Sequence, residues 1–228
     1  NCDLILFTVP DDVLPELVHG LAATAAVSPG TFVVHAAGRY GVEILASLTQ
    51  AGCLPLALHP VMTFTGTSVD LNRLSGCPFG VTAPEVLRPV AEALVVEMGG
   101  DPVWVPEEHR ALYHAALAFG ANGLMALVSE TSSMLQTVGI VEPQRLISPL
   151  LGAALDNALR HGDSAMTGPI VRGDVETVRR HLHEIEKSSP QTLAAYKAMA
   201  RLTAQRALAA GTLSVEAGQR FLELLGDS

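Results

Sequence analysis

The sequence predicts an α/β fold in which a parallel sheet covered by helices is followed by an all-helical domain. Up to residue 106, short apolar runs of strand length alternate with segments of helical periodicity, joined by short connections. From residue 107 to the end, apolar residues recur at helical spacing and no strand-like run occurs. We therefore expect two domains, 1–106 and 107–228.

The first domain should contain five strands and three helices. Its strands are continuous apolar runs, as is typical of parallel strands covered on both faces. They are expected at 4–9, 31–35, 54–59, 79–82 and 102–105. Helices are expected after Asp12, which is placed to cap the first of them, and over 42–51 and 83–98.

The second domain should consist of helices alone. They are expected over 107–130, 131–138, 143–161, 174–187, 190–211 and 214–225. Asp174 is placed to cap one of them, and Ser189 to cap the next, with Pro190 at its first position. The most apolar stretch, 111–128, contains two glycines and polar side chains, so we expect a buried helix and not a membrane span.

Composition restricts the classes of function. The chain carries a net charge of −9 and no basic cluster, which argues against nucleic acid as a partner. Hydrophobic residues make up 49% of its 228 residues, which favours a homodimer. Its cysteines, Cys2, Cys53 and Cys77, have no CxxC spacing, so we expect no disulfide framework and no metal site. With no signal-peptide pattern, these features predict a cytoplasmic protein.

Candidate site residues follow the predicted strands. Parallel sheets bind ligands beyond the carboxyl ends of their strands. The residues there, which we take as candidates for binding a cofactor, are Val9, Pro10, Asp11, His35, Ala37 and Gly38. His59 ends the third strand before Pro60, and is either a ligand contact or proton donor, or a hydrogen-bonded structural histidine. The same two readings apply to His35.

Two polar residues interrupt the long apolar helix. His114 and Asn122 are eight positions apart, which separates them by about 12 Å and roughly 80° on a helix. Ala118 lies between them and would leave room for a ligand. The alternative is that each side chain finds a partner within the helix packing.

The segment 167–174 is a glycine-containing loop between helices. It supplies Thr167, Gly168 and Arg172 as candidates for binding a substrate, since an arginine can hold a carboxylate or phosphate in a bidentate manner. The alternative is an ordinary connection with a solvated arginine. No glycine-rich phosphate loop occurs, neither GxGxxG nor GxxxxGK[ST]. Because the chain opens directly in a strand, we expect such a loop before Asn1.

Five motifs occur in an order that resembles a known family. They are Val9-Pro-Asp-Asp12, His35-Ala-Ala-Gly38, His59-Pro-Val-Met-Thr-Phe64, Tyr113-His-Ala-Ala116 with Asn122, and Thr167-Gly-Pro-Ile-Val-Arg-Gly-Asp174. Together they are similar to bacterial Rossmann-like proteins with a C-terminal domain of unknown function. Those proteins belong to the 6-phosphogluconate dehydrogenase-like superfamily, with the β-hydroxyacid dehydrogenases, ketopantoate reductase and pyrroline-5-carboxylate reductase.

The resemblance implies a partial Rossmann domain that binds NAD or NADP at the strand ends, and a helical domain that dimerises. In better-known relatives, a catalytic lysine lies four residues before the asparagine that Asn122 matches. Ala118 occupies that position here, so His114 or His59 would have to supply the proton. The family commonly has a hydroxyl residue where this chain has Ala37.

The leading hypothesis is an NAD(P)-dependent reductase or dehydrogenase of a small oxo or hydroxy acid, similar to ketopantoate. His59, His114 and Asn122 would border one cleft between the domains. The alternatives are a non-catalytic dimer that binds a dinucleotide or metabolite, supported by the missing lysine, and a purely structural dimer.

Overall fold

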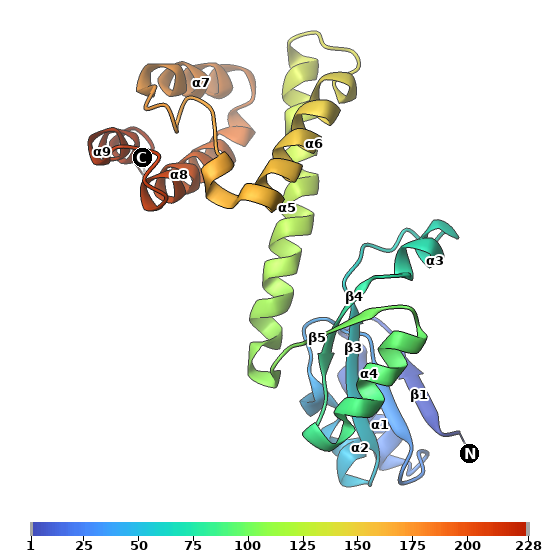
Figure 1. The fold of residues 1–228 in the computed structure, drawn as a ribbon. Coiled ribbons are helices and arrows are strands. Elements are labelled where there is room, and N and C mark those ends of the chain that lie inside the picture. Colours follow the sequence, from blue (N-terminus) through green and yellow to red (C-terminus); the bar gives the residue numbers. More distant parts are fainter. Residues whose placement is uncertain (1, 227–228) are drawn as a thin grey trace. The chain divides into compact units, whose positions relative to one another are not determined.

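The computed structural model describes residues 2–226, and the chain divides into two compact units, Asn1–Asn122 and Gly123–Ser228. The division falls within one long helix (Figure 1). The last strand ends at Trp104, and every later element among the described residues is helical. The domain boundary expected at residue 106 stays a prediction.

The first unit is built on a five-stranded sheet, and this confirms the α/β class. Its strands are β1 (Leu4–Phe7), β2 (Phe32–His35), β3 (Leu54–Pro60), β4 (Pro78–Thr82) and β5 (Asp101–Trp104), in the spatial order β1-β2-β3-β4-β5. Each strand lies where the sequence predicted one.

The sheet is mostly, but not wholly, parallel. Strands β1, β2 and β3 are parallel, whereas β4 runs antiparallel to β3, and β5 follows β4. The expectation of an all-parallel sheet was therefore wrong at this point. The connection from β3 to β4 contains only the short helix α3 (Val69–Leu74), and it returns the chain at the edge where β3 ends instead of crossing the sheet. As a result, Gly80 of β4 lies directly opposite His59 of β3.

Helices cover both faces of this sheet (Figure 1). Helix α1 (Leu14–Ala23), the 3-10 turn η1 (Val42–Leu45) and α2 (Ala46–Gln50) share one apolar core with Val33. On the other face, η2 (Glu85–Leu87) leads into α4 (Arg88–Glu97), which packs against Val34 and its neighbours. Adjacent residues of β2 thus point to opposite faces. The N-cap of α1 is Val13, without a side-chain cap, so the predicted Asp12 cap was wrong.

The longest helix, α5 (Arg110–Thr137), follows the 3-10 turn η3 (Glu107–His109). It is continuous across residues 130–131, where the sequence predicted two helices. By length and composition alone, Glu107–Thr137 is the one helix among the described residues that could cross a membrane. None of its most apolar window is buried within the chain, so the expectation of a buried helix is not met here.

The second unit has its core among three helices, α7 (Val175–Ser188), α8 (Leu193–Ala209) and α9 (Val215–Leu224). Small residues bring them close together: a Cβ on Gly218 would lie 2.6 Å from the side chain of Leu208. Asp174 caps α7 by accepting from the Thr177 amide, as predicted. Ser189 makes no side-chain cap, so that prediction was wrong; a 3-10 turn, η5 (Pro190–Thr192), precedes α8 there.

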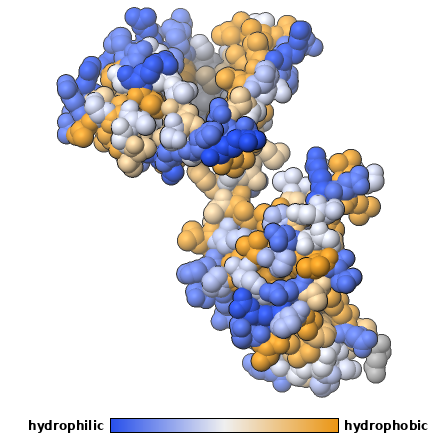
Figure 2. All heavy atoms as spheres, in the orientation of Figure 1, coloured by the Kyte–Doolittle hydropathy of each residue, from blue (hydrophilic) through white to orange (hydrophobic). Residues whose placement is uncertain are grey.

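Helix α6 (Gln144–His161), followed by η4 (Gly162–Ala165), contributes only Ile147 to the buried residues. Together with α5 it presents a large apolar surface. The large apolar side chains exposed on these two helices are Leu112, Phe119, Leu124, Met125, Leu127, Leu146, Leu150, Leu155 and Leu159. Figure 2 shows hydrophobic residues gathered over the end of α5 and over α6. Because α7–α9 close their own core, this surface is left uncovered.

Candidate functional site

The candidate site lies at the edge of the sheet where β1, β2 and β3 end. Because β4 is antiparallel to β3, its amino end meets the same edge. His59, near the end of β3, is half-buried there. The first turns of α5 add Arg110, Tyr113 and His114, which share one face of the helix by their spacing.

His59 is the centre of a small cluster of rings. Its Nδ1 lies 2.8 Å from the Tyr113 hydroxyl. The two ring centroids are 5.7 Å apart and their planes are nearly perpendicular, at 88°. The His114 ring meets His59 edge to face, at 6.1 Å between centroids. The structure thus brings together His59 and His114, two of the three residues that the sequence analysis expected to border one cleft.

Two glycines make room for these rings. A Cβ on Gly38, in the loop after β2, would lie 2.6 Å from His114 Cδ2 and 2.8 Å from His59 Nε2. A Cβ on Gly80 would lie 2.2 Å from the Tyr113 hydroxyl oxygen. Neither site can accept a side chain without moving a ring, so both glycines are part of the site's geometry.

Arg110 fixes the floor of the cluster. Its side chain is only 2% exposed, yet it forms no ion pair among the described residues. Its Nε donates to the Thr82 hydroxyl at 2.7 Å, and Nη2 donates to the carbonyls of Ala57 and Gly80 at 3.1 and 3.0 Å. A longer bond, 3.5 Å, joins Nη1 to the Gly38 carbonyl. One buried cation thereby ties β3, β4 and the loop after β2 together.

The electrostatics of the cluster keep His59 and Tyr113 uncharged. Burial, and then the nearby Arg110 cation and His114, lower the pKa of His59 to about 4. Burial raises the pKa of the Tyr113 phenol, and the Arg110 cation partly opposes this shift. At neutral pH the cluster therefore holds a neutral imidazole and a protonated phenol beside a permanent cation. The proton donor with a pKa near neutrality that the sequence suggested for His59 is not found in this state.

The loop after β2 is held from inside the protein. His35 is fully buried, and its Nδ1 accepts from the Ala37 amide at 3.2 Å. That acceptor role places the proton on Nε2, which donates to the Gly41 carbonyl at 2.8 Å. Burial lowers the pKa of His35 to about 4, so the ring stays neutral. With both nitrogens occupied, His35 can meet a cofactor only through its backbone.

Glu107, on η3, completes this loop. Its carboxylate accepts from the backbone amides of Val42 at 2.7 Å and Glu43 at 3.2 Å, at the start of η1. The carboxylate rests against the Cα of Gly41, where a Cβ would lie only 2.1 Å from it. The turn before α5 and the loop after β2 are therefore fixed to each other.

The other predicted cofactor residues also lie at this edge. Val9 and Pro10 follow β1, and Asp11 forms an ion pair of 3.6 Å with Arg39, which links the loops after β1 and β2. Ala37 is buried beside Gly38. Asn122 is exposed on α5, eight residues beyond His114, and makes no side-chain hydrogen bond among the described residues. The structure does not bring Asn122 into the cluster.

The predicted substrate residues lie in the second unit. Thr167 and Arg172 are exposed, and Gly168 has a positive φ of 101° that favours glycine. They flank the start of α7, where the Arg172 cation helps to lower the pKa of Asp174 after the hydrogen bonds from Thr177.

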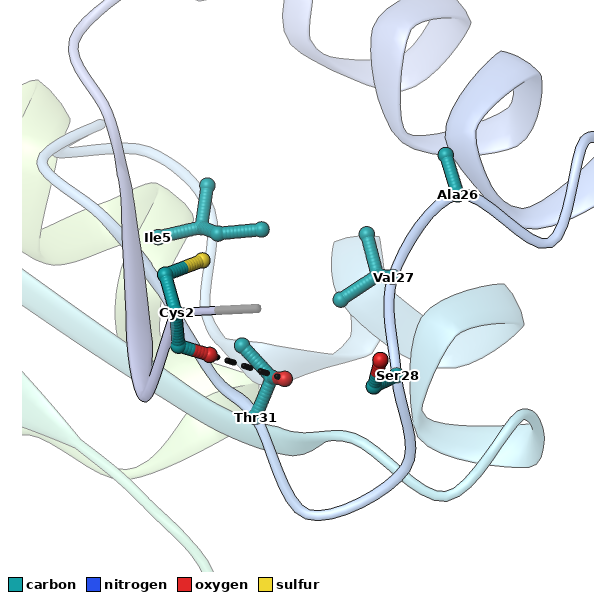
Figure 3. Close-up of a pocket in the computed structure, with 6 residues that line it drawn as sticks. All are labelled: Cys2, Ile5, Ala26, Val27, Ser28 and Thr31. Carbon is teal, nitrogen blue, oxygen red and sulfur yellow. Dashed lines mark hydrogen bonds between the residues drawn. The ribbon is translucent and has the colours of Figure 1, made fainter.

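A cavity of about 220 Å³ lies at the other edge of the sheet. Its lining, drawn in Figure 3, comes from the starts of β1 and β2 and the loop between α1 and β2: Cys2, Ile5, Ala26, Val27, Ser28 and Thr31. Parallel strands place their amino and carboxyl ends at opposite edges, so this cavity is separate from the His59 cluster.

Sequence reasoning missed Arg110 and Glu107, and it quoted Tyr113 only within a motif. A signal for two of them was present: Arg110, Tyr113 and His114 stand at positions i, i+3 and i+4 of one helix. Glu107 left no local signal, because its partners lie 64 and 65 residues away along the chain.

Comparisons with known proteins assign this chain to a family. Residues 77–203 match the family described as domain of unknown function (DUF2520), and residues 1–60 match a Rossmann-like domain. The first match spans more than half of the sequence, so the chain belongs to the DUF2520 family. Comparison with curated proteins gives no match.

Solved structures share the fold. Protein TM1727 from Thermotoga maritima has a TM-score of 0.73 at 24% identity, over 90% of this chain and 78% of that one. BF3122 from Bacteroides fragilis, titled as a candidate NADP oxidoreductase, has 0.71 at 18%, over 89% and 75%. An imine reductase from Myxococcus stipitatus in complex with NADP+ has 0.62 at 14%, over 96% and 80%. At these identities the likeness shows the fold alone.

Proposed function

We propose that this protein is a cytoplasmic NAD(P)-dependent oxidoreductase that reduces the carbonyl of a small oxo acid, similar to ketopantoate, or oxidises the matching hydroxy acid. The observation that carries the proposal is the cluster of His59, Tyr113 and His114 at the carboxyl edge of the sheet. Open α/β sheets bind ligands at this edge. Side chains able to hold and move a proton there are what a carbonyl reduction requires.

The edge suits the nicotinamide end of the cofactor. Val9 and Pro10 are apolar, and Ala37 and Gly38 present a loop without bulky side chains. A side chain at Gly38 would fill the space beside His59 and His114. Two of the similar structures carry NADP in their titles, which supports the same cofactor class here. When bound, the reduced cofactor would supply hydride, while the protein orients the carbonyl and supplies the proton.

Residue roles follow from position. His59 and His114 are the candidate proton donors, because Ala118 stands where better-known relatives have a lysine. We propose that Asn122 helps to position the substrate, and that Thr167, Gly168 and Arg172 bind its acid group. Arg172 is exposed, and a guanidinium matches a carboxylate in a bidentate manner.

We further propose a homodimer whose interface is made mostly by residues after 106. The exposed apolar side chains of α5 and α6 support this, since soluble monomers rarely leave such a surface uncovered. In this dimer the second copy would cover α5, the helix that is long enough to cross a membrane. We favour a second copy of the chain over lipid as the partner of this helix.

A non-catalytic protein that binds a dinucleotide or metabolite is the second candidate. The alanine at position 118 favours it, because the relatives' acid is missing there. Turnover separates the two candidates. The complete protein should be incubated with NADH or NADPH and a panel of small oxo acids, with cyclic imines as a second panel, while absorbance of the reduced cofactor is followed. Oxidation of cofactor with an oxo acid supports the proposal; binding of cofactor without turnover of any compound favours the second candidate.

A further inference from the structure

His59 presents one nitrogen to the protein and the other to the outside. Nδ1 is bonded to the Tyr113 hydroxyl. Nε2 makes no hydrogen bond among the described residues, and no buried side-chain nitrogen or oxygen there lacks a partner, so Nε2 is open to solvent. Gly38 keeps it open, since a Cβ at that position would lie 2.8 Å from Nε2. A ligand at the strand edge would therefore meet Nε2.

The bond to Tyr113 selects the tautomer of His59. A neutral imidazole has one N–H and one lone pair, so Tyr113 either donates to Nδ1 or accepts from it. An imidazole nitrogen is a strong acceptor, whereas a phenol is a better donor than acceptor because its oxygen lone pair is delocalised into the ring. Tyr113 should therefore donate to Nδ1, which leaves the His59 proton on the open Nε2.

Arg110 partly offsets the effect of burial, which makes the phenol proton harder to remove. Its guanidinium carbon is 5.6 Å from the centre of the Tyr113 ring. Both side chains meet Gly80: Nη2 donates to its carbonyl at 3.0 Å, and the Tyr113 oxygen packs on its Cα. No carboxylate lies within ion-pair distance of this cation among the described residues, although Glu107 acts on it from farther away, so negative charge that forms on Tyr113 has a buried positive partner.

We propose that Tyr113 and His59 form a proton relay, in which His59 Nε2 protonates the substrate while Tyr113 reloads Nδ1 and Arg110 stabilises the resulting tyrosinate. This inference rests on the proposed function. His59 is then the catalytic residue, Tyr113 acts through it, and Arg110 is a positioning residue.

The step balances as follows. The carbonyl carbon gains hydride, with two electrons, from a reduced nicotinamide dinucleotide, and the C=O π bond breaks toward oxygen. That oxygen takes the proton from Nε2, so the N–H bond breaks and an O–H bond forms. Nδ1 takes the Tyr113 proton, and the imidazole stays neutral in its other tautomer. Nδ1 later returns its proton to the tyrosinate while Nε2 takes one proton from solvent, which restores the starting tautomer and the phenol.

The chain contains a matched control. His181 and Tyr196, in the second unit, repeat the same pair, with Nδ1 to hydroxyl at 2.8 Å and rings at 6.1 Å and 84°. His181 is exposed and Tyr196 is half-buried against the core of α7–α9, and neither belongs to the proposed site. Tyr196→Phe therefore removes the same type of bond as Tyr113→Phe without touching the relay.

The first test needs no cofactor or substrate. Nitrogen-15 NMR of the histidine rings in the complete protein near neutral pH should show His59 protonated at Nε2 with an unprotonated, hydrogen-bonded Nδ1. Tyr113→Phe should alter the nitrogen chemical shifts of His59. The control Tyr196→Phe should alter only the shifts of His181. The two variants should have comparable thermal unfolding. A His59 ring protonated at Nδ1 in the wild type would overturn the relay, whether or not the protein is a reductase.

The second test uses turnover. Rates in mixtures of light and heavy water should curve, as expected for two protons in flight, and should become linear in Tyr113→Phe with kcat lowered about 10- to 100-fold. Tyr196→Phe should keep the wild-type curvature. A linear dependence in the wild type, or a curved one in Tyr113→Phe, contradicts the relay. A wild type that turns over no substrate overturns the proposed function, while the NMR result still decides how the pair is protonated.

Discussion

The buried His35 and Arg110 and the half-buried His59 define the chemistry at the strand edge. His35 and His59 each have a pKa lowered to about 4, in both cases chiefly by burial. The Arg110 cation contributes to both pKa shifts. Its guanidinium donates hydrogen bonds to backbone carbonyls and not to a carboxylate. Folded His35 and His59 therefore stay neutral at pH values where an ordinary exposed histidine is already protonated.

Stability should fall on mild acidification. An unfolded histidine titrates near pH 6.5, so between that value and about 4 the unfolded chain binds protons that folded His35 and His59 do not. The stabilisation that the two neutral histidines contribute is fully present above this pH window. As the pH falls from about 6.5 to about 4, the free energy of unfolding decreases by up to about 1.4 kcal/mol per pH unit for each histidine. Urea unfolding at about pH 7 and about pH 5 measures the difference.

His35→Gln provides the comparison for that experiment. The glutamine amide can still donate to the Gly41 carbonyl but has no imidazole to titrate. The variant should be less stable at neutral pH and should lose about half of the acid dependence. An acid dependence identical to that of the wild type would show that His35 does not contribute to it.

Gly38→Ala should damage the site through sterics alone. The new methyl group would lie 2.6 Å from His114 and 2.8 Å from His59, so at least one ring must move, at a cost of roughly 1–3 kcal/mol. Gly20→Ala is the control, since nothing lies within 4 Å of its Cβ position on the exposed side of α1. Urea unfolding of both variants measures this cost; a Gly38→Ala protein as stable as Gly20→Ala, with unchanged His59 and His114 NMR signals, would contradict the packing.

The sequence identified His59 and His114 because a histidine at a strand end or on an apolar helix is unusual. It placed both beside one cleft but could not show that their rings touch, because this contact depends on Gly38 and on the reversal of β4, both of which are tertiary features. Arg110 was hidden for a similar reason. At the start of a helix an arginine looks solvated, and only the three carbonyls and the hydroxyl around it make burial tolerable.

Among the elements, η3 and η1 are joined by a single carboxylate. Glu107 accepts hydrogen bonds from two backbone amides at the start of η1, so Glu107→Ala should destabilise the first unit by about 1–2 kcal/mol, the cost of losing an N-cap and a second, exposed hydrogen bond. Glu107→Gln should lose less, because one acceptor oxygen remains. Urea unfolding of Glu108→Ala, an exposed neighbour, gives the baseline; equal losses at 107 and 108 would rule out the bridge.

All five strands could be placed from their apolar runs, whose length and spacing are local properties. The direction of β4 could not, because it depends on how the connection after His59 folds, and the short helix α3 was not predicted from its mixed sequence. The helix α5 was predicted, but it was expected to be buried, and none of its most apolar window is buried within the chain. An apolar sequence on most sides of a helix indicates that the helix packs against other apolar groups. It does not indicate whether these groups belong to the same chain or to a partner.

The molecule as a whole carries an apolar surface that its own fold leaves open. We expect a homodimer at tens of micromolar in analytical ultracentrifugation. Phe119→Glu and Leu150→Glu, at side chains 71% and 67% exposed, should shift the mass to that of a monomer. Val86→Glu, at an even more exposed side chain (84%) of the first unit, should remain dimeric. A monomeric wild type, or dissociation by Val86→Glu alone, would refute an interface formed by α5 and α6.

The proposed redox role of the strand edge rests on His59, and His59→Asn is the sharpest variant for it. Asparagine can keep the bond to Tyr113 through its side-chain oxygen, near the position of Nδ1, while the group at Nε2 disappears. With an oxo acid accepted by the wild type, kcat of His59→Asn for NADPH oxidation should fall by about 10²–10⁴, with the NADPH Kd nearly unchanged. A variant that binds NADPH and retains the wild-type kcat would contradict the assignment of this site.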